Sequence, residues 1–167
     1  MSSRRTLLLA LALCASACAA PGAGPAPGAP AEARAGLAVA PHDLAFRGTV
    51  TDVHVEVDPS GLPFTYVTAR VDERLAGALD GTVSWRIVGG TLPDGRRVDV
   101  ADAPAFRVGE EAYWLLALPR TGATRWPVLA GLAAGKWTRR AGALVVSAAG
   151  DVATEAELRA ALAERAP

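Results

Sequence analysis

The residues best suited to bind a metal lie in one alternating run of polar and apolar side chains. The segment Gly48–Val57 places Asp52, His54 and Glu56 at every second position, with valines between them. Because side chains along a strand point to opposite faces with a period of two, these three polar groups share one face. Carboxylates and imidazole ligate zinc and other transition metals, which makes Asp52, His54 and Glu56 weak candidate ligands. Side chains of a single strand diverge, however, so we interpret this run as the wet face of an amphipathic strand and expect no metal site.

Known arrangements of catalytic residues are absent from the sequence. A serine or threonine nucleophile needs a base held by a third group, and no Gly-x-Ser-x-Gly motif is present. Gly89 and Gly90 follow a predicted strand, but neither a helix nor the remainder of a phosphate-binding motif comes after them. We therefore interpret these glycines as the end of a strand or a bulge, and we expect no catalytic residue and no cofactor.

Tryptophan and arginine offer a different kind of site, a binding surface. Both residue types are favoured where proteins contact each other, and tryptophan also stacks on sugars. The segment Trp137–Arg140 carries Trp137, Arg139 and Arg140, and it is the candidate binding surface that the sequence favours. Packing in the core is the alternative for each of the four tryptophans, Trp85, Trp114, Trp126 and Trp137.

The N-terminus has the three parts of a secretory signal. Arg4 and Arg5 form a basic start, an apolar run follows over residues 6–13, and small residues precede Cys18. The apolar run is about half of the roughly 20 residues that a membrane-spanning helix needs. We therefore predict a signal peptide over residues 1–17 and export of the mature protein.

Cys18 is the predicted lipidation site. Ala15, Ser16 and Ala17 fit both the rule of the ordinary signal peptidase and a bacterial lipobox, although Ala15 stands where a lipobox usually has Leu. The mature domain contains no second cysteine with which Cys18 could form a disulfide, and this favours lipidation. Secretion after ordinary cleavage at the same place is the alternative.

The chain after Cys18 divides into a tether and one domain. Residues 18–36 are almost entirely Ala, Pro and Gly, a composition that does not pack and that holds a domain away from a membrane. Residues 37–167 suit a single domain. The chain has 17 basic and 17 acidic residues, and loss of Arg4 and Arg5 leaves 15 against 17, a net charge of −2. This balance argues against a nucleic-acid partner.

Most of the domain is predicted to be β-structure. The alternating segments Gly48–Val57 and Phe64–Asp72 flank the turn signal Asp58-Pro-Ser-Gly61 and form a predicted hairpin. The apolar segment Glu111–Leu118 is predicted to be covered on both faces. Further strands are expected at Thr82–Val88, Trp126–Leu132, Lys136–Arg139 and Ala143–Ser147, with the last pairing with the two before it.

A short helix is predicted at the C-terminus. Thr154 and Glu157 form a capping box, and Leu158, Ala161 and Leu162 lie on one face of a helix over about residues 155–165. Five to seven short strands with one terminal helix predict a mainly β fold, either a small antiparallel barrel or a sandwich. The specific fold that we expect is a barrel of the oligonucleotide/oligosaccharide-binding (OB) type.

Short motifs in a fixed order add a family resemblance over about Phe46 to Val146. They are Gly48-Thr-Val, Phe64-Thr-Tyr-Val-Thr68, Val88-Gly-Gly90, Pro104-Ala-Phe-Arg-Val-Gly-Glu110, Tyr113-Trp-Leu-Leu-Ala-Leu118 and Gly131-Leu-Ala-Ala-Gly-Lys-Trp137. In this order they resemble a diffuse family of uncharacterised secreted bacterial proteins and lipoproteins with a small OB-like β-barrel domain. Ala134 departs from the family pattern, because other members usually carry Gln there. The resemblance implies a fold and export, and it implies no activity.

These observations lead to one expected function and one alternative. We expect a non-enzymatic lipoprotein domain of the cell envelope, anchored to the outer membrane or the periplasmic face, that binds an envelope protein or a glycan. The alternative is a small hydrolase or a metal-dependent enzyme on the same barrel. A cluster of exposed Trp and Arg would favour the binding module, whereas His54 meeting a carboxylate of another strand inside a cleft would favour the enzyme.

The lipidation site gives a first test. The substitution Cys18→Ser should move the protein from the membrane fraction to the soluble envelope fraction and abolish labelling with a radioactive fatty acid, because no thiol remains to be acylated. Cys14→Ser is the matched control and should change neither. Membrane retention of the Cys18→Ser protein would contradict lipidation at this residue.

Overall fold

The computed structural model describes residues 37–120 and 126–164. The predicted signal peptide 1–17, Cys18, the tether over 18–36 and the expected helix end at Arg165 lie outside the described residues. Those that are described belong to one compact unit. Among them, no helix has the length and apolar character that crossing a membrane would require.

A long antiparallel hairpin and a third strand form one half of the sheet. Strand β1 (Leu44–Val57) pairs with β2 (Pro63–Ala76), and β2 pairs with β3 (Thr82–Val88). At the tip of the hairpin, the amide of Gly61 donates to the carbonyl of Asp58 at 2.9 Å, and Gly61 has a φ of 83°. A glycine takes this left-handed conformation without steric cost, so the predicted turn and hairpin are confirmed.

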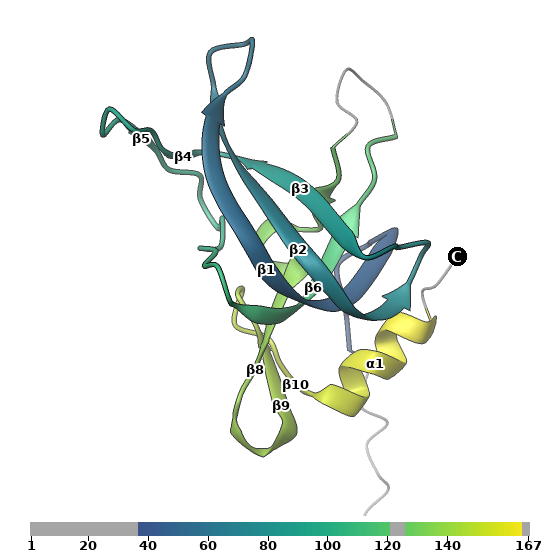
Figure 1. Ribbon diagram of the computed structural model, residues 1–167. Coiled ribbons are helices and arrows are strands. Elements are labelled where there is room, and N and C mark those ends of the chain that lie inside the picture. The colour runs from purple at the N-terminus through teal and green to yellow at the C-terminus, as the bar shows by residue number, and fades with distance from the viewer. Residues whose placement is uncertain (1–36, 121–125, 165–167) are drawn as a thin grey trace, which may run out of the picture. The chain divides into compact units, whose positions relative to one another are not determined.

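The sheet continues on the other side of β1 and curls strongly (Figure 1). Its strands follow the order β10-β9-β8-β6-β1-β2-β3, and β7 also pairs with β6. The amide of Arg86 in β3 donates to the carbonyl of Pro127 at 3.3 Å, which brings β3 beside the β7 segment across the curl. The remaining strands of the sheet are β6 (Glu111–Ala117), β7 (Val128–Leu129), β8 (Lys136–Arg139), β9 (Leu144–Ser147) and β10 (Val152–Thr154).

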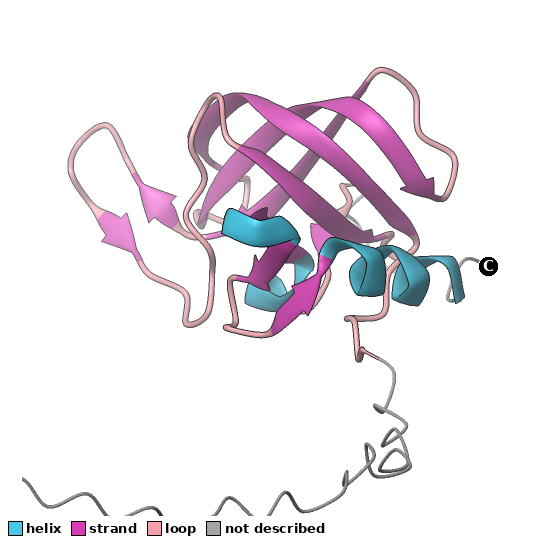
Figure 2. Ribbon diagram, turned by 90° about the horizontal axis from the view of Figure 1, so that it is seen from below, coloured by secondary structure: helices cyan, strands magenta, loops and turns pink. Residues whose placement is uncertain are grey.

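The loop between β3 and β6 forms a small hairpin of its own, which projects from the curled sheet (Figure 2). It contains β4 (Gly90–Thr91) and β5 (Arg97–Val98). Two single-turn 3₁₀ helices, Leu132–Gly135 and Ala141–Ala143, lie beside β8 in the sequence. The predicted mainly β fold, with an antiparallel barrel-like sheet and one C-terminal helix, is confirmed.

One predicted strand pairing is wrong. The segment 126–132 was expected to pair with the strand at 143–147, but only Val128–Leu129 is extended, and these residues pair with β6. Pro127 has no amide hydrogen for a sheet, and Gly131 at a φ of 60° turns the chain into a 3₁₀ helix. The other half of the prediction holds, because β8 pairs with β9.

Strand β6 separates two cores, as the apolar run after Glu111 predicts. Tyr113 and Leu115 face a cluster that includes Leu158 and Leu162 of α1 (Glu155–Glu164). Trp114 and the other residues of β6 that point the opposite way face a cluster of aromatic and aliphatic side chains from β1, β2 and β3. Residues Ala112 to Leu116 are all buried, so each face of this strand has its own apolar covering.

The C-terminal helix begins with the predicted capping box. The Thr154 amide donates to the Glu157 carboxylate at 2.8 Å, and the Glu157 amide donates to Thr154 Oγ1 at 3.1 Å. This reciprocal arrangement satisfies two amides that the first turn of a helix leaves without an intrahelical acceptor. The helix start is therefore determined locally, and the buried Leu158 and Leu162 attach the helix to the sheet.

Lys136, the only lysine of the chain, is buried at the edge of the core beneath the sheet. Its Nζ lies 2.6 Å from Glu110 Oε1 and donates to the Ala105 carbonyl at 2.6 Å. The same ammonium group stands 5.5 Å from the ring centre of Phe106 and 5.7 Å from that of Trp114. Lys136 therefore holds the loop before β6 against strand β8. It also connects two of the short sequence motifs, Pro104–Glu110 and Gly131–Trp137.

Loss of this ammonium group should cost stability. The substitution Lys136→Met leaves the Glu110 carboxylate and the Ala105 carbonyl without their partner, and we expect the free energy of unfolding to fall by about 3 kcal/mol. Urea unfolding measures this change. Adding Glu110→Gln should restore part of the loss, since the remaining group is then neutral. A loss below about 1 kcal/mol would contradict the structural importance of this ion pair.

Candidate functional site

The predicted binding surface around Trp137 is not exposed. Only 1% of Trp137 is accessible, and its indole Nε1 donates to the Ala134 carbonyl at 2.9 Å. The reason is the position of β8, because Trp137 pairs with Tyr113 of β6 on one side and with Ser147 of β9 on the other. Its ring joins the core beneath α1. The expectation of an exposed patch containing Trp137 is therefore wrong, although Arg139 and Arg140 are exposed.

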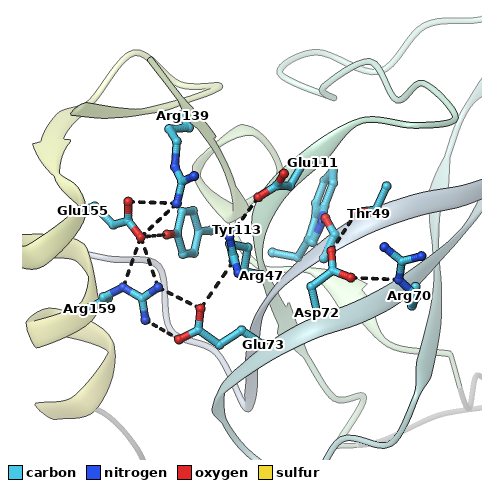
Figure 3. A network of polar contacts seen from close by, with 12 residues as sticks. Arg47, Thr49, Arg70, Asp72, Glu73, Glu111, Tyr113, Arg139, Glu155 and Arg159 are labelled. Atoms are coloured by element: carbon cyan, nitrogen blue, oxygen red, sulfur yellow. Dashed lines mark hydrogen bonds and ion pairs between the residues drawn. The ribbon is translucent and has the colours of Figure 1, made fainter. Parts of the chain in front are cut away.

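Arg139 takes part in a polar network that attaches α1 to the sheet (Figure 3). Its Nη2 lies 3.0 Å from Glu155 Oε2, and the Tyr113 hydroxyl donates to Glu155 Oε1. Arg159 lies between two carboxylates, at 3.1 Å from Glu155 Oε1 and 2.5 Å from Glu73 Oε1. These contacts connect β8, β6, β2 and α1, so Arg139 has a structural partner on its own chain.

The network continues along the sheet toward β1. Arg47 Nε lies 3.4 Å from Glu73, and Arg47 Nη1 lies 3.1 Å from Glu111. The hydrogen bond from Tyr113, followed by contacts with Arg159 and Arg139, lowers the pKa of Glu155 from 4.5 to about 2. A hydrogen bond from Arg159 also lowers the pKa of Glu73. Hydrogen bonds and neighbouring cations thus hold both carboxylates ionised, as in a structural network.

The candidate metal ligands lie together on β1, as their spacing predicts. His54 Nδ1 is 2.6 Å from Asp52 Oδ2, and His54 Nε2 is 3.7 Å from Glu56 Oε1. Between 47% and 66% of each side chain is exposed. Both carboxylates belong to the strand of the histidine itself, and the described residues contain no group of three or more His, Cys, Asp or Glu positioned to hold a metal. The exposure of all three side chains is that of the solvent-facing side of an amphipathic strand.

Aromatic rings from three segments gather beside His54 on the outer surface of the sheet. The imidazole stacks on Tyr66, with ring centres 5.3 Å apart and planes at 9°. Tyr66 and Trp126 pack edge to face, with ring centres 5.3 Å apart and an angle of 76° between the ring planes. The pairing of β1 with β2 places His54 directly opposite Tyr66. The result is a continuous row of three rings that ends at Trp126, of which 39% is accessible.

Arg86 of β3 lies on the same surface. Its guanidinium carbon stands 4.0 Å above the ring of Phe64, and Nη1 lies 3.4 Å from the Tyr66 hydroxyl. Asp58 Oδ2 is 3.9 Å from the same nitrogen, which is within ion-pair range but longer than a hydrogen bond. We call the surface formed by His54, Phe64, Tyr66, Arg86 and Trp126 the aromatic–arginine face. The binding surface that the sequence predicts, at Trp137–Arg140, does not include it.

Part of this face was accessible to sequence reasoning. The turn at Asp58–Gly61 sets the register of the hairpin, and this register brings His54 opposite Tyr66. Trp126 is 60 positions further along the chain than Tyr66, and no sequence pattern relates the two. Their contact depends on the curl of the sheet, which carries the β7 segment to β3.

The paired glycines have a structural role. Gly89 and Gly90 have φ values of 101° and 137°, and Thr65 Oγ1 donates to the Gly89 carbonyl at 2.7 Å. A Cβ on Gly90 would lie 2.7 Å from that hydroxyl oxygen. Only glycine fits this conformation and this close approach, so the pair ends β3 and redirects the chain into the β4–β5 hairpin.

Comparison of the chain with protein-family models, with curated proteins and with solved structures gives no match. The resemblance to secreted bacterial proteins stays a prediction, and the candidate site depends on its geometry alone.

The network at α1 gives a pH prediction. The pKa of Glu155 in the folded protein is depressed, so its stabilising contribution is complete above pH 4.5 and is lost as the pH falls toward 2. We expect Glu155→Gln to lower the free energy of unfolding at pH 7 by about 1–2 kcal/mol, a value that allows for solvent screening. The difference from the unsubstituted protein should shrink between pH 4.5 and pH 2.

Urea unfolding at several pH values measures this effect. Glu164→Gln, at the exposed end of the same helix, is the matched control and should change stability little at any pH. A Glu155→Gln difference that does not vary with pH would show that the charge of Glu155 is unimportant.

Proposed function

We propose that this domain is a non-enzymatic binding module of the cell envelope, attached to a membrane by a lipid at Cys18, and that it binds another envelope protein. The observation that carries the proposal is the aromatic–arginine face, where Trp126, Tyr66 and Arg86 meet on the surface. These three residue types are the ones most enriched among the residues that dominate protein–protein binding energy.

The construction of the face suits binding. His54, Phe64, Tyr66 and Arg86 stand on regular paired strands, so their positions are set before any partner arrives. Ring stacking and the contact of Arg86 with Phe64 restrain the side chains further. A preformed surface loses less conformational entropy when it binds, which leaves more of the contact energy for affinity.

The charges around the face favour a protein over an anionic membrane surface. Three carboxylates, those of Asp52, Glu56 and Asp58, lie on or beside the strands of the face, with Arg86 as the cation among them. Anionic lipids attract surfaces with an excess of positive charge. A partner that carries basic side chains around an apolar centre complements this face better.

A glycan is the second candidate for the same rings. Exposed aromatic rings stack on sugars, and Trp126 and Tyr66 present such rings together. A protein is the first choice because Trp, Tyr and Arg together are the residue types that dominate the binding energy of protein–protein contacts.

Site-specific photo-cross-linking in cells tests the proposal. A benzophenone amino acid placed at Glu56, on the face, should give a discrete cross-linked product with one envelope protein. The same amino acid at Val152, which is 60% exposed on β10, is the matched control and should not give that product. Trp126→Ala should abolish the cross-link at Glu56, because it removes the ring that ends the row.

The two positions separate the outcomes. The same pattern of products from Glu56 and Val152, or a Glu56 product that persists with Trp126→Ala, would contradict recognition by this face. Loss of the product after digestion with glycan-degrading enzymes would identify a glycan as the ligand instead.

A further inference from the structure

A pocket of about 450 Å³ lies at the seam where β3 and β7 meet. Its volume is within the range of sites that hold small ligands. Ile87 and Leu129, both buried, belong to the same core cluster, whereas Val88 and Val128 are each 40% exposed at the rim. We call it the seam pocket. Its lining residues are Phe64, Arg86, Ile87, Val88, Val100, Val128, Leu129 and Leu132.

The lining is apolar except for one cation. Seven of the eight lining residues are hydrocarbon or aromatic side chains, and Arg86 is the eighth. A site with mostly apolar walls and one well-placed charged group is typical of pockets for small amphipathic ligands, in which the charged group sets the orientation. The chemistry of the lining therefore specifies an apolar body and an anionic end.

Arg86 is suited to bind a carboxylate at this position. Only 17% of its side chain is exposed, and it is restrained against the ring of Phe64 at 4.0 Å. A guanidinium offers five N–H donors in a planar fork that matches a carboxylate. A ligand carboxylate at hydrogen-bond distance from Arg86 would form a charge-assisted hydrogen bond, which is stronger than a neutral one.

We propose that the seam pocket binds a small amphipathic carboxylate, a molecule with an unbranched apolar chain in the pocket and its carboxylate on Arg86. This ligand is distinct from the protein partner of the proposed function, although Phe64 and Arg86 belong to both sites. The walls of the pocket include the core residues Ile87 and Leu129, and a flexible hydrocarbon chain can follow such apolar walls more closely than a folded surface does.

Titration with octanoate, followed by the methyl NMR signals of valine and leucine, tests this proposal. The full chain with Cys18→Ser is used, because an acyl chain at Cys18 would compete for the pocket. Octanoate should bind saturably and shift the signals of Val88, Val128 and Leu129. Octan-1-ol should bind at least about tenfold more weakly, since it lacks the charge that Arg86 meets.

Variants identify the group that binds the carboxylate. Arg86→Met should weaken octanoate about tenfold and leave octanol unchanged, whereas Arg96→Met on the β4–β5 hairpin should change neither. Val88→Asp and Val88→Asn form a second matched pair at the exposed rim. These differ only in charge, and Val88→Asp alone should repel octanoate strongly.

Several results would overturn the proposal. One is equal affinity for octanoate and octanol, and another is equal octanoate binding by the two Val88 variants. Tighter binding of the peptide acetyl-Gly-Gly-Leu than of octanoate would identify a polypeptide C-terminus as the occupant. Self-association in analytical ultracentrifugation that Val88→Asp abolishes would indicate a second copy of the chain there. Because the cross-linking at Glu56 is measured separately, failure here leaves the proposed protein contact intact.

Discussion

The burial of both faces of β6 is the constraint on which the rest of the structure depends. Five consecutive residues, Ala112 to Leu116, are buried, with at most 3% of each accessible, and each large apolar side chain among them contributes about 1.5–3 kcal/mol when it is removed from water. A flat sheet of this size would leave one face of the strand wet. The sheet therefore curls over one face, and α1 covers the other.

Ion pairs lie at the edges of the two cores, and they differ in how far they are buried. Beneath the sheet, the compact ammonium of Lys136 fits between a carboxylate, a backbone carbonyl and two aromatic rings. At the helix, Glu155 and Arg159 form a wider network that is partly open to water. Arg139 belongs to this second network. A residue that was predicted to lie on a binding surface therefore forms an ion pair with the C-terminal helix of its own chain.

The aromatic–arginine face and the seam pocket lie where β3, the last strand of the curled sheet, approaches the β7 segment. Strand β3 approaches β7 through the bond between the Arg86 amide and the Pro127 carbonyl, and proline cannot return an amide hydrogen bond. Between two strands that are paired along their whole length, neighbouring side chains pack against each other and leave no gap. At this seam, the looser approach leaves the pocket between Val88 and Val128 and places Trp126 on Tyr66. The same irregularity that ends the sheet thus produces a surface suited to binding.

Local sequence patterns determined most of the elements of this protein. The alternation of polar and apolar residues in two neighbouring segments predicted a hairpin, and the turn at Asp58–Gly61 set its register. The capping box of Thr154 and Glu157 determined where the helix begins. Each of these signals depends on residues that are close in the chain, so the sequence alone is sufficient. The grouping of Asp52, His54 and Glu56 on one face followed from the same local periodicity.

Only the tertiary structure decided which tryptophan is exposed. Trp126 and Trp137 both lie in predicted strands, yet Trp137 is buried between β6 and β9, whereas Trp126 ends a row of rings at the surface. Their environments depend on which distant strands become neighbours, and strand order depends on how the whole sheet curls to cover β6. For this reason the sequence by itself determined the strands and the helix, whereas the candidate face and the seam pocket arose only from their assembly.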